Sequence, residues 1–158
     1  MSAVPQRICC WNRIWFESKP EASVSVTDVI VVSAVCVYNK EGQLLTVRKR
    51  GTDKFMHPGG KPEAGETAAE AAARELFQEV GIEVAPEELE PLGAWLAVAA
   101  NEAATNIEAT VFTAPGTWEA HPSAEIAEIR WLDLAAPLPE DLAPLLTDHV
   151  LPALASPK

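Results

Sequence analysis

The residues best suited to chemistry in this sequence are two glutamates, Glu75 and Glu79, which lie four positions apart. In an α-helix this spacing puts both carboxylates on one face, about 40° apart. Like charges at this spacing repel, so such a pair either remains in solvent or holds a cation. Magnesium takes one or two protein carboxylates together with waters and substrate phosphates. The pair therefore indicates either a solvated helix face or a divalent-metal site.

The residues around this pair form a longer spaced pattern. The segment from Gly60 to Ile82 reads G-KPEAG-E-TAAEAAA-RELFQEVGI. It resembles the Nudix box, which is Gly, five residues, Glu, seven residues, Arg-Glu, an aliphatic, any residue, Glu-Glu, any residue, Gly and an aliphatic. One defined position departs, because Gln78 stands where the family has the first glutamate of the Glu-Glu pair. A match over so many spaced positions is far more specific than a single glycine motif.

The resemblance is to the Nudix hydrolases, or MutT-like proteins, which cleave nucleoside diphosphates linked to another moiety with a divalent metal and an attacking water. It implies that Glu75, Glu79 and the carbonyl of Gly60 hold magnesium or manganese. It also implies that Arg74 orients the glutamates. Such a metal neutralises charge on the pyrophosphate oxygens and lowers the pKa of a bound water. Glu66, the first glutamate of the box, is either catalytic or a first-turn charge favoured by the helix dipole.

Gln78 occupies the third ligand position of the family. Its amide oxygen can coordinate a hard cation, but it carries no negative charge and cannot act as a base. Two functions follow from this change. One is a metal-dependent pyrophosphohydrolase with a weakened metal site, and the other is a catalytically silent module that binds a nucleotide or a protein partner. Because the other positions of the box are intact, we favour the hydrolase.

Further candidates for the site lie outside the box. A basic cluster lies around the start of the box. Four of its residues precede the box and one is the second residue of it: Arg48, Lys49, Arg50, Lys54 and Lys61. Arg48, Arg50 and Lys54 are candidates for binding substrate phosphates, although surface charge alone explains many such clusters. His57, next to the glycine turn, either lines the pocket or packs as a structural histidine.

A carboxylate from a later loop often completes the site in this family. Glu119, Glu125 and Glu128 are available, and Glu125 is our candidate because it stands at the junction of a loop and a strand. A solvent-facing strand charge is the alternative for each of them. Trp95 could stack on a base, but a tryptophan in an apolar strand usually belongs to the core.

Composition narrows the function further. The chain has 158 residues, a net charge of −11 and 48% hydrophobic residues, which favours one globular domain. So acidic a chain is a poor candidate for binding polymeric nucleic acid or anionic membranes, so we expect a small nucleotide or diphosphate substrate. Three cysteines without zinc spacing favour reduced thiols in the cytoplasm.

The hydrophobic pattern predicts an α/β fold in which a mixed sheet lies between helices, as in the Nudix-type α/β/α sandwich. We expect strands at residues 29–38, 43–49, 54–56, 92–100, 105–113 and 125–132, and helices at 67–81 and 140–154. Residues 39–42 are a turn signal, so the first two strands should form a hairpin. Residues 1–25 are predicted to be an extension of uncertain role, before a Nudix domain at 26–158. The aromatic extension and long apolar strands leave room for a homodimer.

Overall fold

The computed structural model describes residues 28–123 and 125–156. Its elements in chain order are β1 (Asp28–Cys36), β2 (Leu44–Lys49), β3 (Gly59–Gly60), α1 (Ala68–Val80), η1 (Pro86–Glu88), β4 (Glu90–Val98), β5 (Thr105–Thr113), β6 (Ile126–Leu132), η2 (Leu146–Val150) and α2 (Leu151–Ala155). The predicted extension at residues 1–25 lies outside the described residues.

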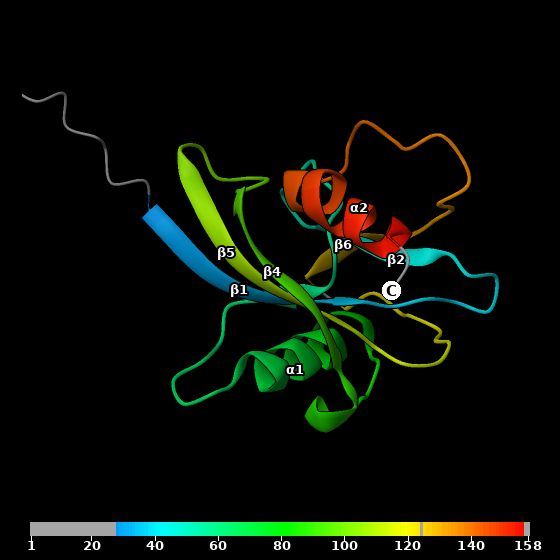
Figure 1. Cartoon of the computed structure of the whole chain (residues 1–158), viewed down its shortest axis with the longest axis horizontal. Helices are drawn as coiled ribbons and strands as arrows, with labels where there is room; N and C mark the ends of the chain where they lie inside the picture. Colours follow the sequence, from blue (N-terminus) through cyan, green and yellow to red (C-terminus); the bar gives the residue numbers. More distant parts are fainter. Residues whose placement is uncertain (1–27, 124, 157–158) are drawn as a thin grey trace, which may run out of the picture.

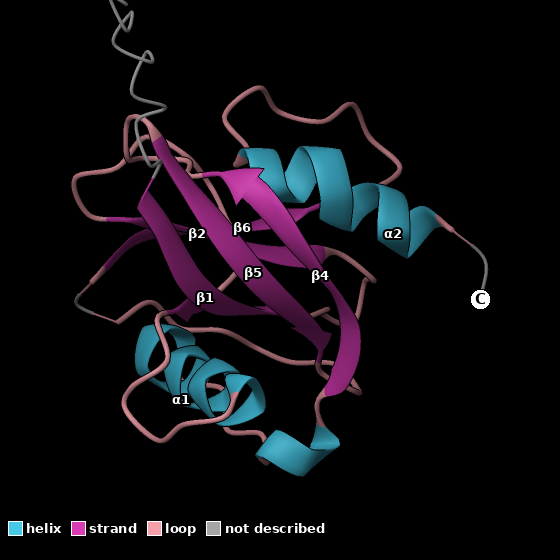
Figure 2. Cartoon of the chain, turned by 60° about the vertical axis from the view of Figure 1, so that its left-hand side comes forward, coloured by secondary structure: helices cyan, strands magenta, loops and turns pink. Residues whose placement is uncertain are grey.

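A mixed sheet forms the middle layer, with strand order β3-β1-β5-β4. β1 and β5 are parallel, whereas β3 and β4 run antiparallel to their neighbours. β2 and β6 form a second, antiparallel sheet. Helix α1 covers one face of the larger sheet and α2 lies on the other (Figures 1 and 2). The predicted α/β/α sandwich is therefore confirmed.

Each face of the sheet has its own apolar core. Val35 on β1 packs with Leu76 and Val80 of α1 on one side. Cys36, the next residue, points to the other side and packs with Leu146 and Val150 of the C-terminal helical segment. Successive strand residues point to opposite faces of a sheet, so Val35 and Cys36 enter different cores. Each face at the centre of the sheet is thus covered by a helical segment.

Helix α1 begins and ends where the sequence predicts. Thr67 is the N-cap: its hydroxyl accepts from the N–H of Glu70, while the Glu70 carboxylate accepts from the N–H of Thr67. Gly81 ends the helix with φ 72°, a left-handed conformation that glycine adopts without strain. Leu76 is fully buried on the face of the helix that packs against the sheet. These local signals fix where the helix that carries Glu75 and Glu79 begins and ends.

The predicted hairpin between the first two strands is wrong beyond its turn. Tyr38 and Leu44 form one antiparallel bridge, after which β2 leaves the larger sheet to pair with β6. The reason is that another segment already occupies this edge of β1. The N–H of Val35 donates to the Pro58 carbonyl, and β3 pairs with β1 directly beside it.

Three other elements differ from the prediction. The expected strand at 54–56 is reduced to isolated bridges at Phe55 and Met56. The strand expected at residues 29–38 ends at Cys36 as β1, and its first half projects beyond α1 and leaves Val29 and Val31 exposed (Figure 1). The last helical stretch begins only at residue 144, because the chain before it is bonded to both the N–H and the carbonyl of Phe55.

The last helical segment also changes its winding. Residues 146–150 are π-helical, and the N–H of Leu151 donates to the carbonyl of Leu146. Pro152 follows directly and has no N–H to continue the regular ladder. Single π-helical turns of this kind occur as bulges within α-helices. The segment still buries Leu146 and Val150 against the sheet.

The capping box gives a test of the fold. Thr67→Ala removes the hydroxyl that accepts from the Glu70 N–H, so we expect a loss of about 1 kcal/mol in the free energy of unfolding. Urea titration followed by circular dichroism measures it. Thr117→Ala, at an exposed loop threonine, is the matched control and should change the free energy by less than about 0.5 kcal/mol. Equal effects of the two variants would contradict a role for the cap.

Candidate functional site

The carboxylate of Glu79 is buried where α1 meets the glycine turn. Its side chain is only 1% exposed, although an isolated helix would leave it in solvent. The backbone N–H of Gly59 donates to Glu79 Oε2 at 3.1 Å. On the other oxygen, Oε1 lies 2.7 Å from the Nζ of Lys49. The pair of glutamates is thus not a solvated helix face.

Lys49 joins the helix to the turn. Its Nζ donates to the Gly59 carbonyl at 3.1 Å while contacting Glu79. Burial raises the pKa of the Glu79 carboxyl, and the ammonium of Lys49 and the N–H of Gly59 only partly offset this. The negative charge of Glu75 raises the same pKa slightly further, so the two carboxylates interact electrostatically.

Gly60 allows the Glu75 carboxylate to lie against the turn. A Cβ on Gly60 would stand 2.5 Å from Glu75 Cδ and 2.6 Å from Oε1, closer than such atoms can approach. A side chain at position 60 would therefore displace the Glu75 carboxylate from this position. The glycine turn and the two glutamates form one compact group at the edge of the sheet.

Arg74 organises the other side of this group. Its Nε and Nη2 donate to both oxygens of Glu66, at 2.6 and 2.9 Å. Its Nη1 donates to Glu75 Oε1 at 2.7 Å and to Gln78 Oε1 at 3.1 Å. The Arg74 hydrogen bonds, with help from the N–H of Glu63, lower the pKa of Glu66 to about 2. Glu66 is therefore a charged partner of Arg74 and a poor proton acceptor.

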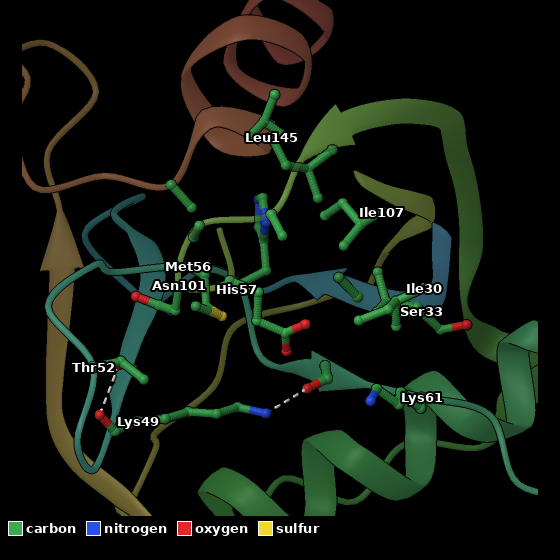
Figure 3. A pocket seen from close by; sticks show the side chains of 18 residues that line it. Ile30, Ser33, Lys49, Thr52, Met56, His57, Lys61, Asn101, Ile107 and Leu145 are labelled. Carbon is green, nitrogen blue, oxygen red and sulfur yellow. Dashed lines mark hydrogen bonds between the residues drawn. The ribbon is translucent and has the colours of Figure 1, made fainter. Parts of the chain in front are cut away.

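An elongated cleft of about 250 Å³ adjoins the glycine turn on the α2 side of the sheet. Lys49, Gly59 and Lys61 line the end beside the glutamates (Figure 3). His57 lines the cleft and points toward Leu145 (Figure 3). It is buried, and burial lowers its pKa to about 4. The predicted place of His57 in a pocket is therefore what the structure shows, whereas its role remains a prediction.

The other predicted phosphate contacts lie outside this cleft. Arg48 pairs with Glu128 at 3.2 Å and donates to the Thr52 carbonyl. Lys54 donates to the Glu140 carbonyl and lines a neighbouring hollow. Arg50 is exposed at the end of β2. The lysines that do line the cleft, Lys49 and Lys61, belong to the same basic cluster but were not singled out by the sequence.

The alternation of side chains along β2 could have predicted that Lys49 faces the site. Leu45 and Val47 belong to the core that contains α1, and alternation along β2 puts Lys49 on the same face. The sequence alone did not reveal that this face meets the helix, because that depends on β2 leaving the hairpin. No comparable signal marks Lys61.

Glu125 is exposed, and its backbone lies near the group without a described side-chain contact to it. Its carbonyl accepts from the Arg50 N–H, and the nearby Ser123 N–H donates to the Glu79 carbonyl. Glu128 pairs with Arg48, and Glu119 is exposed. Trp95 stacks on His149 of η2 and packs against the core on the α2 side, as the alternative reading expected.

The donor set fits a magnesium-type ion better than a closed metal cage. Within residues 28–123 and 125–156, no three carboxylate, imidazole or thiol side chains form a ready-made metal cluster. Two carboxylates and a glycine carbonyl are nevertheless what magnesium uses when waters and substrate phosphates supply its other ligands. The missing side chain of Gly60 permits the Glu75 carboxylate to lie beside the turn, and Arg74 Nη1 holds it there by donating to Oε1.

The protein is an α/β/α sandwich, with a mixed sheet between two helices (Figures 1 and 2). Within this class it is distinguished by a helix whose carboxylates pack against a glycine turn. The family model of the NUDIX domain matches residues 28–154, so the chain belongs to this family. Members of the family generally use divalent metals. No helix in the described part of the chain is long and apolar enough to cross a membrane.

Individual relatives are similar over part of the chain. "Phosphatase NudJ" of Escherichia coli K12 is 40% identical over 68 residues, which is 42% of this chain and 44% of that protein. The chain thus spans less than half of this relative's length. The MutT NUDIX hydrolase from Burkholderia pseudomallei has a TM-score of 0.63 at 21% identity, covering 80% of this chain and 96% of that one. The MutT protein from Methanosarcina mazei Go1 has a TM-score of 0.59 at 24% identity, covering 70% and 80%. The two structures show a shared fold.

The Lys49–Glu79 pair gives a test of the site. Lys49→Met leaves a buried carboxylate without its cation, so we expect a loss of about 1–3 kcal/mol in the free energy of unfolding at pH 7. The raised pKa means that the folded protein binds this proton more tightly than the unfolded chain, so burial of Glu79 costs stability as pH rises. Once Glu79 is protonated the attraction to Lys49 disappears, and the difference between variant and native protein should shrink toward acid pH.

Denaturant unfolding across a pH series measures this difference. Lys61→Met is the matched control, because its exposed side chain lines the same cleft without an ion pair among the described residues. An effect of Lys49→Met that does not vary with pH would contradict the proposed electrostatic origin.

Proposed function

We propose that this protein is a metal-dependent pyrophosphohydrolase that cleaves a nucleoside diphosphate linked to another moiety. The observation that carries the proposal is the group formed by Glu75, Glu79 and the glycine turn, whose Gly59 lines one end of a cleft. That end of the cleft also carries the ammonium groups of Lys49 and Lys61. Carboxylates for a metal and cations for phosphates thus lie side by side, which suits phosphoryl chemistry.

Glu75, Glu79 and the Gly60 carbonyl are the proposed ligands of magnesium or manganese, with the Gln78 amide as a weaker fourth group. When bound, the metal would neutralise charge on the pyrophosphate and make a bound water more acidic. Arg74 positions Glu75 by its hydrogen bond to Oε1. Glu66 in turn holds Arg74 through two hydrogen bonds, which we propose as its role in the site.

The proposed general base must be a carboxylate other than Glu66, whose pKa of about 2 makes it a weak acceptor. Gln78 cannot take a proton. Glu79 has a raised pKa, but its carboxylate is a proposed metal ligand and already contacts Lys49 and Gly59. Glu125 remains our candidate, because its segment lies next to the end of α1 and its side chain is exposed.

On the substrate side, Lys49 and Lys61 are better placed for phosphates than Arg48 and Lys54, which bond to the protein itself. Arg50, at the end of β2, stays a candidate for the outer phosphate. Lys49 would serve two partners, since its ammonium already contacts Glu79. A phosphate placed there would share this cation with the carboxylate.

A second function, a silent binding module, is favoured by one observation. Both carboxylates already have cationic partners, Glu75 in Arg74 and Glu79 in Lys49, and the Gln78 oxygen is held by Arg74. A metal must compete with these contacts without the third negative charge that the family pattern supplies. Such a site could bind a nucleotide without hydrolysing it.

Turnover separates the two functions. We expect the native protein with magnesium or manganese to release phosphate products from at least one of a panel of nucleoside diphosphate derivatives. Glu79→Gln should lower the rate about 100-fold, because it removes a proposed metal ligand. Gln78→Glu should raise metal affinity by restoring a negative charge. Glu83→Gln, at an exposed glutamate just past the helix, is the control and should leave turnover unchanged.

The remaining outcomes are also informative. Turnover by Gln78→Glu alone would show that the amide has switched the chemistry off. Nucleotide binding without turnover in all variants would establish the binding module. Turnover that survives Glu79→Gln would contradict the proposed metal site.

A further inference from the structure

The cleft beside the glycine turn has two chemically different ends. The end next to the glutamates presents the ammonium groups of Lys49 and Lys61. Away from it, the walls are mostly apolar side chains: Ile30, Val32, Met56, Ile107, Ala143 and Leu145. Thr52, Asn101 and Glu102 also line the cleft. The cleft therefore suits a ligand with negative charge at one end and an uncharged, mainly apolar group at the other.

His57 interrupts the apolar walls with a single unpaired polar atom. Its side chain is almost completely buried, and Nε2 has no hydrogen-bond partner. Figure 3 shows its imidazole among the lining side chains, directed toward Leu145. Burial lowers its pKa to about 4, so the ring is neutral at physiological pH. A neutral imidazole offers one donor and one acceptor nitrogen.

A histidine with a purely structural role normally has its buried ring nitrogens hydrogen-bonded, and His57 Nε2 is not. Buried polar groups in folded proteins are paired almost without exception, and leaving one unpaired destabilises the fold. Two other unpaired buried atoms occur among the described residues. Glu79 Oε1 is already in an ion pair with Lys49. Ser33 also lines the cleft, but it lies on β1 between Val32 and Ala34, so strand alternation directs its hydroxyl away from the face that those two residues share. His57 is thus the unpaired group that lies among the apolar lining residues of the cleft (Figure 3).

We propose that His57 determines the specificity of this cleft by hydrogen bonding to an uncharged heteroaromatic ring of the ligand. The phosphates of the same ligand then lie at the Lys49 and Lys61 end. The inference rests on the proposed function for the position of these phosphates. It goes further in naming the group that selects the substrate and the kind of moiety that it selects.

The size and lining of the cleft favour a ring over other moieties. A volume of about 250 Å³ is at the small end for ligand clefts, so one ring system fits and a second nucleoside would remain outside. A sugar would bring several hydroxyl groups to walls that are mostly aliphatic, and each unpaired hydroxyl would weaken binding. A flat ring buries its faces against Ile30, Val32 and Ile107 and needs only edge partners such as His57.

Calorimetric titration of the full chain with magnesium tests this inference without relying on turnover. The probes are AMP, GMP, CMP and UMP, with ribose 5-phosphate as the phosphate that lacks a ring. We expect at least one nucleotide to bind tenfold or more tightly than ribose 5-phosphate. His57→Phe keeps a ring but removes both nitrogens, so it should weaken that nucleotide about tenfold and leave ribose 5-phosphate unchanged.

Two further variants distinguish loss of the hydrogen bond from a general effect of replacing a histidine. His57→Gln retains a donor and an acceptor and should recover part of the lost affinity. His149→Phe, on η2 against Trp95, is the matched control and should bind like the native protein. If His57→Phe fails to fold, the imidazole signals of His57 in the native protein provide the test, since the tight-binding nucleotide should shift them and ribose 5-phosphate should not.

The inference is overturned if ribose 5-phosphate binds as tightly as every nucleotide, if none of the probes binds, or if His57→Phe binds like the native protein. Hydrolysis of the substrate panel without dependence on His57 would leave the proposed function standing and remove this inference. Ring-selective binding through His57 without any hydrolysis would do the reverse.

Discussion

The buried Glu79 carboxylate is the interaction on which the site depends. It joins three segments that are distant in the chain: helix α1, the end of β2 through Lys49, and the glycine turn through the N–H of Gly59. A buried carboxylate is costly unless it is paired and hydrogen-bonded, so all three segments must meet for it to be tolerated. The same contacts bring the carboxylate near Glu75 and join it to Lys49 and Gly59, which line the end of the cleft.

Arg74 plays the corresponding role at the exposed side of α1. Its guanidinium spans Glu66, Glu75 and Gln78 and thereby fixes the direction of the Glu75 carboxylate. Gln78 does not disturb this arrangement, since its amide oxygen accepts from the same guanidinium. The departure from the family pattern therefore removes a charge without removing the geometry, which is why metal affinity is the property that we expect it to change.

Local signals made much of the fold predictable. The capping box at Thr67, the glycine at position 81 and the buried Leu76 follow from helix chemistry alone, and the spaced box indicated the family. Long-range features did not follow. The departure of β2 to pair with β6 depends on the Pro58–Gly60 segment taking the edge of β1, and the burial of Glu79 depends on that departure. Helical periodicity alone therefore placed Glu79 beside Glu75 but gave no sign that it is buried or that Lys49 is its partner.

The central claim is that Glu75, Glu79 and the glycine turn hold a divalent cation. Paramagnetic broadening of backbone amide signals by substoichiometric manganese tests it most directly on the full, isotope-labelled chain. We expect the signals of Gly59, Gly60, Glu75 and Glu79 to lose intensity first. Uniform broadening, or broadening that begins at another acidic stretch such as Glu87–Glu88, would contradict the claim.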